Sequence, residues 1–140
     1  LVNNHDFSTD IEGWNGGTVI TDADNSFFQA DVASAGDPWA VNLSQVLTLV
    51  PSKEYVLTFK AKGSVDRSMI AGIGLNAAPY HSSTNIIGLT TEWQTFTYTL
   101  ISNDDTTGTP YGDSNSRVLF DMGAEVGVVS IDDVKLFEKK

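Results

Sequence analysis

The chain has 140 residues, contains no cysteine and carries a formal net charge of −10, from eighteen acidic and eight basic residues. The length predicts a single domain over residues 1–140 that can bury a sizeable core, and the cysteine count excludes disulfides and thiolate metal sites. The acidic balance argues against nucleic acid and anionic membranes as partners, because their phosphates bind clusters of Lys and Arg. Neutral ligands and divalent cations remain.

Short β-strands are predicted along the whole chain. Val, Ile, Thr, Phe and Tyr alternate with polar residues between turns rich in Gly, Asn, Asp and Ser, and no segment keeps a helical period. Strands are expected over residues 18–22, 27–32, 39–45, 55–62, 68–75, 95–100, 117–122 and 127–137. Residues 102–116, rich in Asp, Thr and Gly, are expected to form a long loop. This spacing is typical of an all-β, antiparallel β-sandwich.

Residues 37–45 combine a turn, a large aromatic ring and an uncharged polar strand face. An Asp-Pro pair precedes Trp39, and the strand that follows places Asn42 and Ser44 on one face and apolar residues on the other. Aromatic surface beside amide and hydroxyl groups suits a sugar ring, which has apolar C–H faces and a rim of hydroxyls. Two interpretations of Trp39 stay open here: a ligand platform, or a core residue at the start of a strand.

The strand over residues 117–122 has an unusual outward face, formed by Arg117, Leu119 and Asp121. The guanidinium of Arg117 donates hydrogen bonds, and the carboxylate of Asp121 accepts them from hydroxyls. One interpretation is an ion pair between the two on an ordinary surface. The other is that both line the same hollow as Asn42 and bind sugar hydroxyls.

Five motifs occur in order along the chain, at residues 4–14, 38–45, 55–62, 90–96 and 129–134. Together they resemble the family 4 carbohydrate-binding modules and the related families 9 and 22, over essentially the whole chain. The resemblance implies a β-jelly roll whose concave face forms a groove for a single polysaccharide chain. It also implies a secreted, extracellular module that holds an attached glycoside hydrolase on β-glucan or xylan.

The resemblance assigns roles to individual positions. Trp39 matches the family's tryptophan platform, and Asn42 matches a polar residue that hydrogen-bonds the sugar. Tyr80 is the best match for a second platform, in a loop of variable length, with His81 beside it as a further contact or simply as a solvated loop residue. Asp121 falls near another groove position, with Arg117 one repeat away on the same face.

Acidic turn residues supply oxygen atoms of the kind that Ca²⁺ binds. The resemblance implies a structural calcium ion whose ligands match Ser8, Asp24, the carbonyl of Phe27, and Asp132. Ser8 stands where many members carry glutamate, which weakens the site or shifts it towards Asp6. Alternatively, these aspartates only make local backbone hydrogen bonds in turns.

Two other functional classes are alternatives to carbohydrate binding. Glycoside hydrolysis needs two carboxyl groups about 5–9.5 Å apart, one with a raised pKa, and Glu92, Asp121 and Glu125 are candidates that no motif pairs. A calcium-binding adhesive or protein-interaction jelly roll would use Trp39 and Tyr80 as contact hot spots, within a contiguous apolar patch. The sequence therefore favours a monomeric, non-catalytic binding module, for β-1,3-glucan such as laminarin first, mixed-linkage or β-1,4-glucan next, and xylan as the alternative.

Overall fold

The computed structural model describes residues 1–16, 18–22 and 25–139. The described elements, in chain order, are β1 (Thr18–Asp22), β2 (Asn25–Val32), the 3-10 turn η1 (Pro38–Ala40), β3 (Asn42–Leu47), β4 (Glu54–Gly63), β5 (Arg67–Leu75), β6 (Ser82–Leu89), β7 (Gln94–Ile101), β8 (Ser116–Asp121) and β9 (Gly127–Glu138). Within this part of the chain, no helix is long and apolar enough to cross a bilayer.

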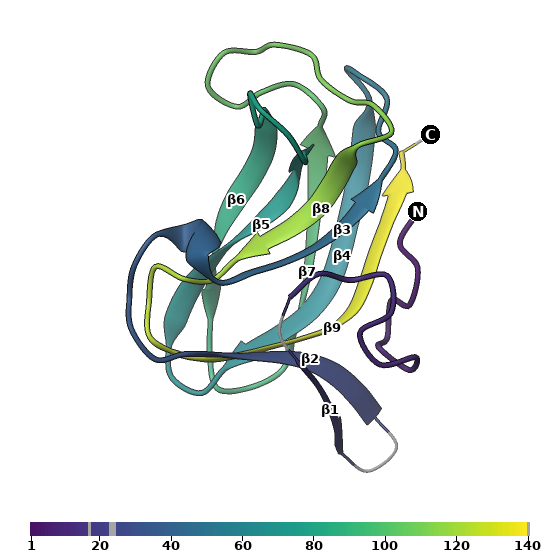
Figure 1. Cartoon of the computed structure of the whole chain (residues 1–140). Coiled ribbons are helices and arrows are strands. Elements are labelled where there is room, and N and C mark those ends of the chain that lie inside the picture. Colours follow the sequence, from purple (N-terminus) through teal and green to yellow (C-terminus); the bar gives the residue numbers. More distant parts are fainter. Residues whose placement is uncertain (17, 23–24, 140) are drawn as a thin grey trace.

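The strands form two antiparallel sheets that pack face to face (Figure 1). A five-stranded sheet has the order β1-β2-β9-β4-β7, and a four-stranded sheet has the order β3-β8-β5-β6. Both termini lie on the same side of the molecule in Figure 1. The predicted all-β, antiparallel β-sandwich is confirmed.

The core lies between the sheets and follows directly from the alternation along each strand. In β4, Tyr55, Leu57 and Phe59 are buried, whereas the residues between them face outward. Phe59 meets Phe120 of the opposite sheet edge-to-face, with ring centroids 5.1 Å apart. Such contacts bury apolar surface at about 25 cal/mol per Å² and fix which face of each strand is left to the outside.

Strand β6 was not predicted, and its sequence explains why. Ser83 faces the core and is buried, whereas Ile86 faces outward and is 77% exposed. The polar and apolar residues therefore do not separate by face, and the period-2 signal of a strand is lost. Ser83 is accommodated inside because its hydroxyl bonds to the carbonyl of Ile101 at 2.5 Å and to the hydroxyl of Tyr111 at 2.9 Å.

Trp39 lies in a 3-10 turn, and the prediction that it begins a strand was wrong. Pro38 is pre-set for the first position of a helical turn because its φ is fixed, and Ala40 donates a hydrogen bond to the carbonyl of Asp37 at 3.0 Å. Gly123 donates to the carbonyl of Pro38 at 2.9 Å. The turn is thereby attached to the segment that follows β8.

A candidate ligand groove on the four-stranded sheet

The outward face of the four-stranded sheet has a floor built from three rows of residues. Strand pairing places one residue from β8, one from β5 and one from β6 side by side in each row. The rows are Arg117–Gly74–Ser82, Leu119–Gly72–Thr84 and Asp121–Ile70–Ile86. Because side chains alternate along a strand, all of these point to the same side.

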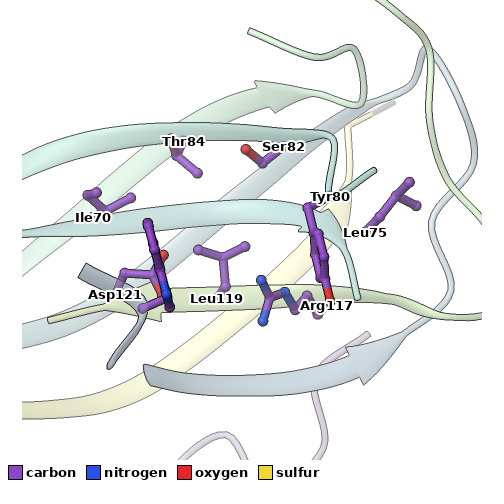
Figure 2. Close-up of a pocket in the computed structure, with 9 residues that line it drawn as sticks. Ile70, Leu75, Tyr80, Ser82, Thr84, Arg117, Leu119 and Asp121 are labelled. Atoms are coloured by element: carbon purple, nitrogen blue, oxygen red, sulfur yellow. The ribbon is translucent and has the colours of Figure 1, made fainter. Parts of the chain in front are cut away.

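Two glycines leave the middle of this floor open. A Cβ atom at Gly72 would lie 2.2 Å from the carbonyl oxygen of Ser83, and one at Gly74 would lie 2.8 Å from that of His81. Only glycine permits this close approach of the neighbouring backbone. The result is a groove of about 680 Å³ (Figure 2). It is lined by Trp39, Ile70, Leu75, Tyr80, Ser82, Thr84, Arg117, Leu119 and Asp121.

Two aromatic rings border the groove and are open to solvent. Trp39 is 66% exposed and Tyr80 is 59% exposed, although both are large and largely apolar. The ring of Tyr80 lies beside Arg117 in Figure 2. Tyr80 has a φ of 56°, which a bulky side chain rarely adopts. Such a conformation persists only where the surrounding turn holds it, and here the amide of Tyr80 bonds to the carbonyl of Ala77 at 2.9 Å.

The polar groups of the groove face are not paired as an ordinary surface would pair them. The Nε of Arg117 is buried and has no hydrogen-bond partner among the described residues. Asp121 instead accepts a hydrogen bond from the side-chain amide of Asn42 at 2.5 Å. Arg117 and Asp121 sit in different rows with Leu119 between them. The interpretation in which both line one hollow is therefore favoured over an ion pair between them.

The remaining predicted contacts lie at or beyond the edge of the groove. Asn42 does not line the groove itself and acts on it through Asp121. His81 is also outside the lining and turns away: its Nδ1 lies 2.9 Å from Asp104 Oδ2, and its ring stacks on Tyr111. Burial raises the pKa of Tyr111 to about 12.

Asp104 anchors the long loop against the turn that carries Tyr80. Its carboxylate accepts hydrogen bonds from the hydroxyl and amide of Thr106, from Thr107 and from His81. These bonds, that of the Thr106 hydroxyl first, hold the pKa of Asp104 well below its ordinary value. The loop therefore supports one wall of the groove without entering it.

Sequence reasoning missed several lining residues, namely Ile70, Leu75, Ser82 and Thr84. Ile70 and Leu75 lie on β5, and Ser82 and Thr84 lie on β6. They come together with the groove residues of β8 only through the register of three strands. One signal was present in the chain. Gly72 and Gly74 alternate within an apolar strand, and glycine in a strand interior often marks a close backbone approach or a ligand.

The predicted calcium ligands are only partly brought together. Asp132 is buried on β9, beside β2, which carries Phe27. Burial raises the pKa of the Asp132 carboxyl. Ser8 is exposed in an N-terminal turn, where its amide bonds to Asp6 at 3.1 Å, and Asp24 lies outside the described residues. No cluster of three or more Asp, Glu, His or Cys gathers among the described residues.

Comparison with known proteins supplies a family and a set of structural neighbours. A family model described as "Carbohydrate binding domain" matches residues 1–113. Among curated proteins, none matches the sequence. A solved structure described as "CBM4 structure and function" superimposes with a TM-score of 0.77 at 23% identity, over 99% of this chain and 100% of that chain.

Two further neighbours share the fold. The second N-terminal cellulose-binding domain of Cellulomonas fimi β-1,4-glucanase C has a TM-score of 0.71 at 24% identity, over 96% of this chain and 91% of that chain. TmCBM61 in complex with β-1,4-galactotriose has a TM-score of 0.66 at 14% identity, over 99% of this chain and 97% of that chain. At these identities the likeness concerns the fold.

Proposed function

Since this chain belongs to the carbohydrate-binding domain family of CBM families 4 and 9, we propose that it binds a single chain of neutral β-glucan in the groove of the four-stranded sheet. The observation that carries the proposal is the pair of exposed rings, Trp39 and Tyr80, on one groove whose lining combines apolar and hydrogen-bonding side chains. β-1,3-Glucan is the first candidate, mixed-linkage or β-1,4-glucan the next, and xylan the alternative.

The geometry of the groove supports this ligand in energetic terms. Each ring that covers the C–H face of a sugar removes apolar surface from water and contributes about 1–2 kcal/mol. Hydrogen bonds from Arg117 and to Asp121 add about 0.5–1.5 kcal/mol each. After the cost of association, this amounts to roughly micromolar affinity. Such binding is tight enough to hold a protein on a polymer and weak enough to be reversible.

The carboxyl groups near the groove support a binding role over a hydrolytic one. A glycosidase needs an acid with a raised pKa. The carboxylate of Glu125 instead accepts hydrogen bonds from the hydroxyl and amide of Ser68, which lower its pKa. Asp121 is bonded to Asn42. We therefore propose a non-catalytic, secreted module that tethers an attached glycoside hydrolase to its polysaccharide.

Affinity electrophoresis tests this proposal. The protein is run in gels that contain laminarin, mixed-linkage glucan, hydroxyethylcellulose or xylan, with a Trp39→Ala variant beside it. We expect the strongest retardation in laminarin and the loss of that retardation in the variant. Retardation by xylan alone would select the alternative, and normal mobility in all four gels would contradict the proposal. Release of reducing sugar from laminarin would contradict the non-catalytic role.

We also propose that a structural calcium ion binds beside Asp132. The support is the buried carboxyl itself, since a desolvated carboxylate is stabilised by a cation, together with the position of Phe27 on the neighbouring strand. Bound calcium would tie β2 to β9. We expect Ca²⁺ to raise the melting temperature after treatment with EDTA, and Asp132→Asn to abolish this rise. An unchanged melting temperature with Ca²⁺ would contradict the site.

A further inference from the structure

A second, smaller hollow adjoins the groove beyond Asp121. It has a volume of about 120 Å³, and its apolar walls come from Pro38, Ile70, Ile86, Met122 and Ala124. We call it the end hollow. Ile70 and Asp121 line both the end hollow and the groove, so the two adjoin.

The most exposed large apolar side chain in the described structure stands at this place. Ile86 is 77% exposed and occupies the same row as Ile70 and Asp121. Its β6 neighbours on the groove face, Ser82 and Thr84, are polar. Along β6, the groove face thus changes from polar to apolar at the row that opens into the end hollow.

Apart from Asp121 at its boundary, the polar side chains of the end hollow are already used within the protein. Arg67 donates from Nε to the carbonyl of Ser68 at 3.1 Å, from Nη1 to that of Glu125 at 2.6 Å and from Nη2 to that of Met122 at 2.5 Å. The hydroxyl and amide of Ser68 both donate to the carboxylate of Glu125. A sugar hydroxyl placed here would lose water without gaining a donor from these groups, which is unfavourable.

We propose that the end hollow receives an apolar substituent on the terminal residue of the bound glycan, either the acyl group of an ester or the ring of an aryl glycoside. The inference depends on the glycan-binding function proposed above. The walls suit a group without hydrogen-bonding needs, and the volume suits one of a few heavy atoms. Asp121 stands at the boundary, where its carboxylate accepts hydrogen bonds from hydroxyls of the last sugar.

The test compares three ligands by isothermal titration calorimetry on the intact chain. They are β-1,3-glucotetraose, the same tetraose as its 4-nitrophenyl glycoside, and the tetraose with an acetyl ester on its non-reducing residue. We expect one of the substituted ligands to bind at least about fivefold more tightly than the plain tetraose, as burial of a small apolar group allows. The aryl and acyl arms place the substituent at opposite ends of the sugar chain, so the preferred arm also gives the direction of binding.

Two variants assign the gain to the end hollow. Ile86→Ser should remove the fivefold gain, so that the substituted and plain tetraoses bind with equal affinity whatever the variant does to the plain tetraose alone. Ile101→Ser, at an isoleucine of β7 that is 44% exposed, is the matched control and should keep the gain. Equal or weaker binding of both substituted ligands, or a gain that survives Ile86→Ser, would overturn the inference while the proposed function stands. No binding of the plain tetraose would contradict β-1,3-glucan as the ligand, and the inference, which is tested on that ligand, would fall with it; the four-gel comparison then decides separately whether the glycan-binding function stands.

Discussion

The outer faces of the two sheets share the same alternation and differ in how their polar groups are partnered. On the five-stranded sheet, Lys60 pairs with Asp133 at 3.2 Å, and the ammonium group of Lys62 lies over the ring of Trp93, 5.1 Å from its centroid. On the groove face, the Nε of Arg117 has no partner in the described chain. A donor without a partner beside a hollow remains available to a ligand, whereas the paired groups of the other face do not.

The three tryptophans show the same contrast. Trp14 is 6% exposed, and its Nε1 donates to the carbonyl of Asn4 at 3.0 Å. Trp93 directly precedes β7 of the five-stranded sheet and meets Phe27 edge-to-face at 5.4 Å between centroids. Trp39 alone among them is mostly exposed, at 66%. A tryptophan can therefore serve as a sugar-binding platform only where its ring face is exposed to solvent, and the residue type alone does not decide this.

The largest effect should come from exchanging these rings for alanine. Trp39→Ala should lower affinity for laminari-oligosaccharides by about 2 kcal/mol or more, roughly thirtyfold, with little change in melting temperature, because the ring is mostly exposed. Trp93→Ala should lower the melting temperature, since it removes packing on Phe27, and should leave the affinity unchanged, since the groove stays intact. Calorimetric titration and thermal denaturation of both variants separate the two roles. Equal losses of affinity in Trp39→Ala and Trp93→Ala would contradict the assignment of glycan binding to the four-stranded sheet alone.

Tyr80→Ala should cost about 1–2 kcal/mol of binding free energy, because the smaller ring offers less apolar surface than an indole. Tyr80→Phe should retain most of the affinity if stacking is the main contribution. Titration calorimetry with the same oligosaccharide measures both variants. A Tyr80→Phe loss as large as that of Tyr80→Ala would show that the hydroxyl, and not the ring face, makes the contact.

Arg117→Met should lower the affinity for the glycan without lowering the stability of the fold. The variant removes the hydrogen-bond donors and should weaken binding by about 1 kcal/mol. It also removes a buried nitrogen without a partner, so the free energy of unfolding should stay level or rise. Urea denaturation and calorimetry check the two quantities separately. A clear fall in stability would mean that the guanidinium is partnered in the free protein.

The smallest effect concerns the loop that supports Tyr80. Hydrogen bonds hold the pKa of Asp104 below its ordinary value of 3.8, so the ionised carboxylate stabilises the folded state above that pH. This stabilisation is lost as the pH falls through the folded-state pKa. The melting temperature of Asp104→Asn should therefore be lower than that of the original chain at neutral pH, and the gap should narrow in strong acid. A gap independent of pH would contradict the ionised role.

The strand pattern predicted most of the fold because burial acts on each strand separately. Residues 55–62 alternate so regularly that only one face can be buried, and this places Phe59 in the core without knowledge of any partner strand. Residues 82–89 lack that separation, since Ser83 is buried and Ile86 is exposed. Their strand forms because pairing with β5 satisfies the backbone, which is a property of the neighbour.

The site residues also fall into a group that the sequence predicted and a group that only the tertiary structure reveals. Trp39, Tyr80, Arg117 and Asp121 were expected from the sequence and its family resemblance, and all four line the groove. Nothing local to residues 70–75 or 82–84 says that they share a sheet face with Leu119, because register is set by the packing of three strands against a common core. Only the tertiary structure therefore decides the shape of the groove. The sequence alone determines which aromatic and hydrogen-bonding groups the groove offers, because the identity of a side chain does not depend on its neighbours in the fold.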